Sequence, residues 1–217
     1  MDNFFDQIYV LNLDRRPDRW DTIQVQLHNA GITKAVRFPA IDKEPGAPNH
    51  SEAAHAACFR THVAALHMAL DTGASNVLIF EDDAALYDDW EPIWKSSKRQ
   101  IPSDWDVLYL GYNLEPKYQP NLTTPTFVTS NILLLNDVLA LHAYAINGSH
   151  IATLIEQQES QYELNIPGDV AFAKHNSGFR VYGIYPMLFY QSPGFSDIVG
   201  CPVNYNLRHN VDQVLAK

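Results

Sequence analysis

The sequence predicts an α/β fold in which a mostly parallel central sheet is flanked by helices. Short β-rich runs alternate with helical stretches along the chain, and the clearest of these runs are apolar throughout, as in strands covered on both faces. This alternation is typical of an α/β sandwich with a mostly parallel sheet. At 217 residues, with 46% hydrophobic residues, the chain predicts a single domain over residues 1–217.

The first expected elements are a strand, a helix and a second strand. Residues 7–13 are β-rich and nearly apolar, which favours a buried strand. A helix over 18–30 ends at Gly31, an expected residue just past a helix end. Residues 35–41 are expected to form the next short strand.

A loop rich in proline and glycine, residues 44–49, leads to a long helix. Ser51 is the expected N-cap, and the helix runs to about Asp71 before Gly73 closes it. The apolar residues 77–80 predict a third strand. The remaining expected elements are a helix over 88–97, a strand over 105–110, a strand over 141–146, a helix capped by 147–149 and running to 160, a short helix beginning at Pro167, and a strand over 180–190.

The polar stretch between residues 113 and 126 carries several prolines and is expected to be a surface loop. A loop of this length is more often functional than a short one, for instance as a lid or as an acceptor-binding segment. It therefore joins the candidate functional regions.

Composition and charge restrict the partners. The formal charge of −10 disfavours binding to a nucleic acid, so a nucleotide handled here is expected to be a small ligand in a local pocket. The two cysteines lack metal-ligand spacing and are expected to be reduced thiols. No signal peptide and no membrane-spanning run is recognisable, so we expect a cytoplasmic location, including the surface of a membrane that bears the acceptor.

The acidic triplet Glu81, Asp82 and Asp83 follows directly after the strand 77–80. In open α/β sheets ligands bind beyond the carboxyl ends of the strands. Adjacent carboxylates raise one another's pKa unless a cation or a base neutralises them, and hard oxygen ligands suit Mg²⁺ or Mn²⁺. The triplet therefore predicts a divalent-cation site that also borrows oxygens from a substrate diphosphate. The alternative is a solvated strand end that caps the next helix.

An arginine cluster follows the first strand, within Asn12-Leu-Asp-Arg-Arg-Pro-Asp-Arg19. Guanidinium groups match both phosphates and carboxylates, so the cluster can contact a nucleotide or pair with the acidic residues. A salt-bridged helix start is the alternative interpretation. Histidines 55, 62 and 67 share the long helix without a recognised zinc spacing, which favours structural roles for them. A P-loop, a G-x-G-x-x-G fingerprint and a serine nucleophile elbow are absent from the sequence.

The segment Ile8-Tyr-Val-Leu-Asn-Leu-Asp-Arg-Arg-Pro-Asp-Arg-Trp20 resembles the opening signature of glycosyltransferase family 25, which contains lipopolysaccharide sugar transferases and collagen galactosyltransferases. The other matching segments, in the expected order, are 37–42, 60–62 with 69–70, 77–83, 105–111, 142–146, 185–186, Gln191 and 196–198. The family's Gly-Cys-x-x-Ser-His motif stands here as Ala57-Cys-Phe-Arg-Thr-His62, and threonine keeps the hydroxyl. The loop 113–126 and the tail after 200 give no match, so acceptor choice is expected there.

The resemblance implies a GT-A fold and an inverting, metal-dependent transfer of a hexose, with galactose or glucose favoured, from a UDP-sugar to a glycan or glycoconjugate hydroxyl. It implies Mn²⁺ or Mg²⁺ at Asp83, with Glu81 or Asp82 as the second ligand. Asp169 is the expected catalytic base and Asp197 the second choice, although Asp169 also fits an ordinary carboxylate in a first helical turn. The expected donor-binding residues are Asn12, Leu13, Arg15, Arg19, Asp42, His62, Asp82 and Gln191.

Two other functions compete with this interpretation. Carboxylates after a buried strand also serve metal-dependent phosphohydrolases, but an aspartyl-nucleophile enzyme wants Asp at the first position of its motif, where this chain has Glu81. A non-catalytic nucleotide-sugar-binding relative is the other alternative, and the intact triplet argues against it. A bacterial or viral glycan pathway is favoured over collagen modification, because the chain is short and shows no endoplasmic-reticulum signal.

Overall fold

A computed structural model of the chain describes residues 1–46, 49–119, 121–162, 166–175 and 178–216. Two residues of the expected loop 44–49, numbers 47 and 48, lie outside this part. The strands are β1 (Gln7–Asn12), β2 (Val36–Pro39), β3 (Asn76–Glu81), β4 (Ala84–Leu86), β5 (Val107–Asn113), β6 (Thr126–Thr129), β7 (Ile132–Leu135), β8 (Leu139–Asn147), β9 (Val181–Ile184), β10 (Phe189–Gln191), β11 (Gly194–Phe195) and β12 (Pro202–Val203). The helices are α1 (Pro17–Asn29), α2 (His50–Asp71), α3 (Trp90–Ser97), α4 (Gly148–Glu159), α5 (Gly168–His175) and α6 (Leu207–Leu215).

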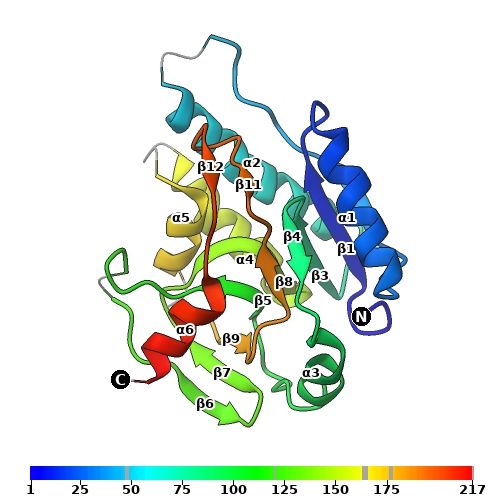
Figure 1. Cartoon of the computed structure of the whole chain (residues 1–217), viewed down its shortest axis with the longest axis vertical. Coiled ribbons are helices and arrows are strands. Elements are labelled where there is room, and N and C mark those ends of the chain that lie inside the picture. The colour runs from blue at the N-terminus through cyan, green and yellow to red at the C-terminus, as the bar shows by residue number, and fades with distance from the viewer. Residues whose placement is uncertain (47–48, 120, 163–165, 176–177, 217) are drawn as a thin grey trace.

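Within the described residues, eight of these strands form one sheet in the order β2-β1-β3-β8-β5-β9-β7-β6 (Figure 1). The pairings of β1 with β2, β1 with β3 and β5 with β9 are parallel. The strands β8 and β7 run against their neighbours, so the sheet is mixed. The expected α/β fold with a central sheet flanked by helices is thus confirmed, and the reversed strands are an addition that the sequence pattern does not reveal.

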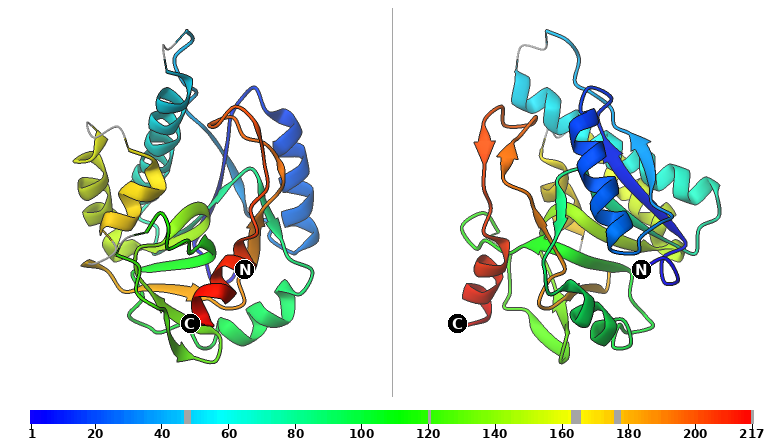
Figure 2. Two further views of the ribbon diagram at one scale, coloured as in Figure 1. Left: turned by 60° about the vertical axis from the view of Figure 1, so that its left-hand side comes forward. Right: turned by 45° about the vertical axis from the view of Figure 1, so that its right-hand side comes forward.

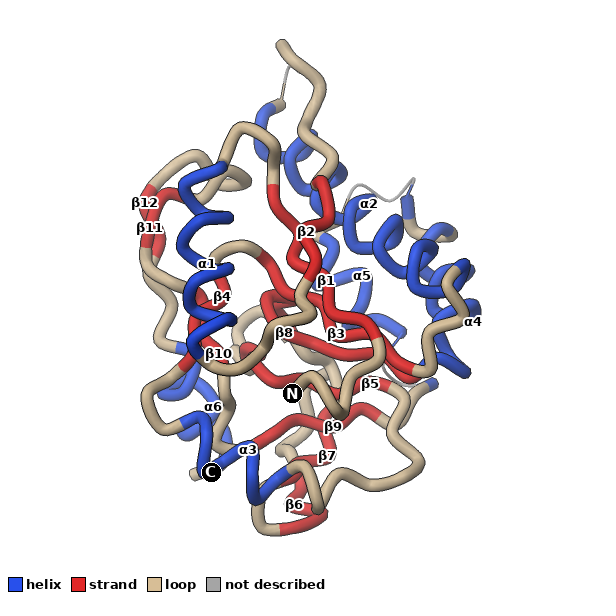
Figure 3. The backbone as a smooth tube through the Cα atoms, turned by 90° about the vertical axis from the view of Figure 1, so that its right-hand side faces the viewer, coloured by secondary structure: helices blue, strands red, loops and turns tan. Residues whose placement is uncertain are grey.

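Alternate residues of the strands pack into two apolar clusters on the two faces of the sheet. In β3, Val77 and Ile79 belong to one cluster, whereas Leu78 and Phe80 belong to the other. The first cluster includes side chains of α2, α4, α5 and α6, and the second includes those of α1 and α3. Figures 2 and 3 show this layering, with α1 on one side of the strands and α2 and α4 on the other. A strand buried on both faces is therefore apolar at successive positions, and such a strand can be predicted from its unbroken apolar run in the sequence.

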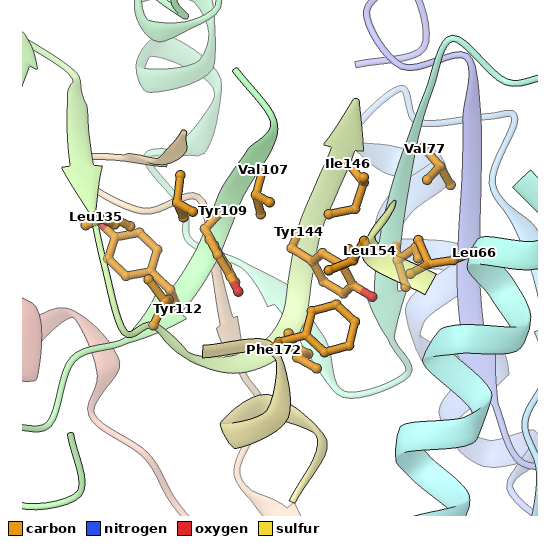
Figure 4. Packing of buried hydrophobic residues seen from close by; sticks show 14 of the residues in the cluster. Leu66, Val77, Val107, Tyr109, Tyr112, Leu135, Tyr144, Ile146, Leu154 and Phe172 are labelled. Carbon is orange, nitrogen blue, oxygen red and sulfur yellow. The ribbon is translucent and has the colours of Figure 1, made fainter. Parts of the chain in front are cut away.

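The first cluster contains buried tyrosines next to the acidic end of β3. Tyr109 and Tyr144 lie on neighbouring strands with their ring centroids 6.1 Å apart, and Phe172 of α5 meets Tyr144 edge-on at 5.6 Å (Figure 4). The hydroxyl of Tyr144 lies 3.0 Å from Nδ1 of His62 on α2.

Two of the expected helix ends are confirmed, and one expected cap is wrong. Gly31 and Gly73 have φ values of +72° and +66°, which glycine adopts without strain after a helix. Ser51, however, is not the N-cap of α2. The cap is Asn49, whose side-chain oxygen accepts a hydrogen bond from the backbone N–H of Glu52 at 3.2 Å, so the helix begins earlier than expected.

The last third of the chain departs most from the expected elements. The strand expected over 180–190 is divided into β9 and β10, and the cis peptide bond between Tyr185 and Pro186 lies between them. The strands β10, β11 and β12 have two or three residues each, as does β4 earlier in the chain, and α6 lies in the tail where no element was expected. None of the described helices is long and apolar enough to cross a membrane.

Candidate active site

A cleft of about 340 Å³ opens beyond the carboxyl ends of β1 and β3. Its walls come from the loop after β1, the helix α2, the start of α5 and the segment from 191 to 207. The sequence-predicted site residues that line it are Leu13, Arg15, Arg19, Asp42, His62, Glu81, Asp82, Asp83, Asp169, Gln191 and Asp197. Asn12 is buried, and its side-chain amide donates a hydrogen bond to the cleft residue Asp82. The fold therefore gathers nearly all of the predicted side chains at one place.

The acidic triplet forms the turn between β3 and β4. Glu81 is the last residue of β3, and Ala84 pairs with Gln191 of β10 immediately after the turn. The backbone N–H of Ser192 donates to the carbonyl oxygen of Asp83 at 2.8 Å. The turn is consequently fixed from one side by β1 and from the other by β10.

Asp82 is fully engaged within the protein. One of its carboxylate oxygens accepts from the Asn12 side-chain amide at 2.7 Å, and the other accepts from the Arg19 guanidinium at 2.7 Å. Burial raises the pKa of Asp82, while Arg19 opposes that rise. The other atoms of the Asn12 side chain also have partners, because its oxygen accepts from Arg37 at 2.7 Å and its amide also donates to the Arg16 carbonyl oxygen at 2.9 Å.

The carboxylate of Asp83, unlike that of Asp82, has an oxygen without a hydrogen bond from the part of the chain that the structure describes. Its buried Oδ1 has no hydrogen-bond partner among the described residues, and its Oδ2 lies 3.7 Å from the Arg19 guanidinium. Burial and the negative charge of Glu81 together raise the pKa of Asp83 to about 7, against the opposing effects of the Arg19 charge and of a hydrogen bond with Gln191. A buried carboxylate oxygen without a donor is costly unless a proton or a cation satisfies it. The group therefore fits a hard divalent cation.

Glu81 has one engaged oxygen and one that is nearly free. Its Oε1 lies 3.2 Å from His62 Nε2, and the other nitrogen of that imidazole, Nδ1, lies 3.0 Å from the Tyr144 hydroxyl. Its Oε2 accepts a long hydrogen bond of 3.5 Å from the Gln191 amide, with no shorter one from the part of the chain that the structure describes. Burial alone would raise the pKa of Glu81, but the hydrogen bond from His62 leaves that pKa below its ordinary value. The donor set that fits Mn²⁺ or Mg²⁺ is thus Asp83 Oδ1 with Glu81 Oε2, while Asp82 holds the turn.

The arginine cluster after β1 pairs with carboxylates from distant parts of the chain. Arg15 donates to Asp42 at 2.6 Å and to Asp197 at 2.5 Å, and Arg16 donates to the other oxygen of Asp197. The carbonyl oxygen of Asp197 also lies 3.0 Å from His50 Nε2. These contacts fasten the segment that carries β11 and β12 across the mouth of the cleft, beside the start of α2.

The two candidate bases have opposite electrostatic environments. Asp169, at the start of α5, accepts backbone hydrogen bonds from Ala140 at 3.2 Å and from Val170 at 2.9 Å, and burial raises its pKa. Burial would also raise the pKa of Asp197, but the hydrogen bonds and charges of Arg15 and Arg16 lower it below its ordinary value. Asp169 is therefore the better proton acceptor at neutral pH.

Three further cleft residues were not predicted as site residues. Tyr205 lies close enough to Asp83 and Asp169 that their charges, after burial, raise the pKa of its hydroxyl. Cys58 lies one helical turn before His62 on α2, and His55 lies near Asp169. The four-residue spacing of Cys58 and His62 was readable in the sequence, since such positions share one helix face. The sequence did not indicate a role for Tyr205, because this residue lies in the tail after residue 200, which matches none of the family's motifs.

Comparison with known proteins gives a family match over most of the chain. The family model described as "Glycosyltransferase family 25 (LPS biosynthesis protein)" matches residues 5–169. Two curated relatives are similar over 129 residues, covering 49% of this chain and 22% of each relative. They are the human "Inactive glycosyltransferase 25 family member 3", 24% identical, and the Bos taurus "Probable inactive glycosyltransferase 25 family member 3", 21% identical. The chain thus spans about a fifth of the length of these relatives.

Among solved structures, "A197 from STIV" aligns with a TM-score of 0.50 and 12% sequence identity, covering 92% of this chain and 93% of that one. At this identity the likeness concerns the fold. It agrees with the α/β architecture of a mixed sheet between helices that the central strands display.

Proposed function

The chain belongs to glycosyltransferase family 25, and we propose that it transfers a hexose, galactose or glucose, from a UDP-sugar to a glycan or glycoconjugate hydroxyl with inversion at the anomeric carbon. The observation that carries the proposal is Oδ1 of Asp83, which has no hydrogen-bond partner among the described residues, at the floor of a cleft lined by Arg15 and Arg19. The same proposal includes a cytoplasmic location, where the unpaired thiols of Cys58 and Cys201 stay reduced.

The donor diphosphate is assigned to the floor of the cleft. Asp83 and Glu81 would hold Mn²⁺ or Mg²⁺ there, and the bound cation would supply positive charge beside the diphosphate leaving group. Asn12 and Asp82 act behind this pair, because their mutual hydrogen bond keeps the turn in place. Arg19 lies between Asp82 and Asp83 and adds a second positive charge on the leaving-group side. Leu13, Asp42 and His62 complete the donor pocket.

The acceptor hydroxyl is activated by Asp169. An inverting displacement requires a base opposite the leaving group, and a carboxylate with a raised pKa accepts a proton most effectively near neutral pH. The backbone N–H groups of Ala140 and Val170 fix the orientation of this carboxylate. We assign Asp197 to holding Arg15 and Arg16, because an ion-paired carboxylate is a weak base.

A non-catalytic nucleotide-sugar-binding protein is the second candidate. It is favoured by the names of the two curated relatives, which describe them as inactive or probably inactive. Such a protein would bind the donor through the same cleft without consuming it.

The test is a panel of UDP- and GDP-sugars incubated with Mn²⁺, with and without glycan acceptors, in which released nucleotide is measured. We expect release from a UDP-hexose that depends on Mn²⁺, and we expect its loss in Asp83→Ala. Binding of the same donors is measured in parallel by calorimetry.

The outcomes separate the two candidates. Donor binding that requires Asp83, without turnover on any acceptor, would favour the binding protein. If no donor binds or is consumed and Asp83→Ala behaves like the wild type, both candidates fail.

A further inference from the structure

Three side chains of metal-ligand type meet at the base of the cleft. Cys58 and His62 lie one turn apart on α2, and Glu81 ends β3 opposite them. Their donor atoms, the thiol sulfur, an imidazole nitrogen and a carboxylate oxygen, all lie within 4.8 Å of one another. All three residues line the cleft, so an ion can reach them from solvent.

The imidazole of His62 is held in one orientation. It is completely buried, its Nδ1 lies 3.0 Å from the Tyr144 hydroxyl, and its Nε2 lies 3.2 Å from Glu81 Oε1. Histidine ligands commonly have a partner on the nitrogen that does not bind the metal, and this partner fixes the tautomer and the ring. The Tyr144 hydroxyl occupies that position, because it can accept from Nδ1 as readily as it can donate to it.

We propose that Cys58 Sγ, His62 Nε2 and Glu81 Oε1 form a binding site for a thiophilic divalent cation, Zn²⁺, with a fourth position open to the cleft. Tetrahedral Zn²⁺ with bonds of about 2.0 Å to nitrogen and oxygen separates these two ligands by about 3.3 Å. The 3.2 Å between His62 and Glu81 matches this separation without movement. The sulfur lies within 4.8 Å of the other two donor atoms, so it has to approach by at most on the order of 1 Å to reach bonding distance.

The chemistry of the donors distinguishes this site from that of Asp83. Thiolate and imidazole ligands favour Zn²⁺, whereas carboxylate oxygens alone favour Mn²⁺ and Mg²⁺. The two sites share Glu81, each through a different oxygen.

The protons balance as follows. Burial and the nearby carboxylates raise the pKa of the Cys58 thiol, so the free protein carries a neutral thiol. Binding forms the S–Zn bond and releases that proton to the solvent. A metal bond to Nε2 requires that this nitrogen carries no proton, so the ring proton lies on Nδ1 in the bound form and is donated to the Tyr144 hydroxyl. No oxidant or further reactant takes part.

The experiment is a titration of the purified, metal-free, full-length protein with Co²⁺, a spectroscopic substitute for Zn²⁺. Coordination by the cysteine thiolate gives a near-ultraviolet charge-transfer band. We expect one Co²⁺ per chain and displacement of the band by Zn²⁺. Cys58→Ser should lose the band. The matched control is Cys201→Ser, which removes the exposed cysteine and should keep it.

Two further variants strengthen the test. Tyr144→Phe keeps the three ligands and removes the partner of His62, so we expect Zn²⁺ affinity to fall roughly 10- to 100-fold. Asp83→Asn should retain the Co²⁺ band while losing Mn²⁺ binding, which makes this result independent of the proposed sugar transfer. The proposal is overturned if folded Cys58→Ser, verified by circular dichroism, retains the band, or if Cys201→Ser abolishes it.

Discussion

Asp82 and Asp83 are adjacent in the chain, yet their carboxylates have different surroundings. Asp82 receives two short hydrogen bonds from Asn12 and Arg19, whereas Oδ1 of Asp83 receives none from the described residues. At the level of single residues, this contrast supports the proposal that Asp82 holds the turn while Asp83 is a metal ligand. It also predicts how substitutions at Asp83 affect stability.

Asp83→Asn is expected to remove a pH-dependent loss of stability. The folded-state pKa of Asp83, about 7, lies above the ordinary value of 3.8, so the folded protein binds this proton more tightly than the unfolded chain. The resulting stabilisation is complete below about pH 4 and is lost as the pH rises towards 7. The metal-free wild type should therefore lose on the order of 3 kcal/mol of unfolding free energy, relative to Asp83→Asn, between pH 4 and pH 8.

Urea denaturation in EDTA at the two pH values measures this difference. Asp82→Asn is the comparison variant, since it breaks hydrogen bonds with Asn12 and Arg19 and should destabilise the protein at both pH values. Equal pH slopes for wild type and Asp83→Asn would contradict the assignment.

Asp169→Asn is expected to lower kcat by roughly 10²- to 10⁴-fold while leaving donor affinity nearly unchanged, because it removes the base without altering the donor cleft floor. Asp197→Asn should have a smaller effect on kcat and should instead weaken the attachment of the segment carrying β11 and β12. Single-turnover kinetics with saturating donor separates the two. If the rate of the chemical step falls in Asp197→Asn but not in Asp169→Asn, Asp197 rather than Asp169 is the base.

The structure brings most of the predicted site residues to one cleft, because these polar positions directly follow strands that the sequence pattern reveals. The acidic triplet comes directly after an unbroken apolar run, and the parallel pairing of β1 with β3 brings the arginine cluster to the same edge. The hydrogen-bond partners of these residues could not be predicted from the sequence. The hydrogen bonds between Asn12 and Asp82, and between Arg15 and Asp197, join positions 70 and 182 residues apart, and no local pattern encodes them.

At the level of elements, the long helices and the strands buried on both faces were predictable, whereas the short strands were not. A strand of two or three residues, such as β11 or β4, is too short to show a period. It exists because another segment pairs with it. The N-cap at Asn49 was missed for a similar reason, since Ser51 and Asn49 are both good capping residues and only the backbone decides between them.

Gly111→Ala tests how closely β5 and β10 approach below the site. A Cβ atom at this position would lie 2.2 Å from His142 Nε2 and 2.6 Å from the Phe189 carbonyl oxygen, so β10 would have to shift. We expect a loss of about 1 to 3 kcal/mol in unfolding free energy, measured by urea denaturation. Gly178→Ala, where nothing lies within 4 Å, is the control and should change stability by less than about 0.5 kcal/mol. A stable Gly111→Ala protein would contradict this packing.

At the level of the whole molecule, both apolar clusters pack against the same sheet, and the cleft draws on residues from Leu11 to Leu207. We therefore expect one calorimetric unfolding transition for the chain, in keeping with the single domain predicted from its length. UDP with Mn²⁺ should move the whole transition upward, by about 2.7 kcal/mol of unfolding free energy at a ligand concentration 100 times Kd.

Asp83→Asn is the control for that shift and should show little stabilisation by Mn²⁺ with UDP. A wild-type protein that unfolds in two separate transitions, only one of which responds to the ligands, would contradict the single-domain prediction.

β10 pairs with the strand after the acidic turn, and Asp197 forms ion pairs with the arginine cluster. Both contacts matter for the order in which the site forms during biosynthesis. A ribosome makes the N-terminal residues first, so a growing chain carries Glu81, Asp82 and Asp83 long before Gln191 and Asp197 exist. Until those later residues emerge, the triplet lacks the strand that braces it, and Arg15 and Arg16 lack their carboxylate. On the proposed function, we therefore expect the nascent chain to bind no donor until residues 189–207 have been translated and have packed against the acidic turn and the arginine cluster.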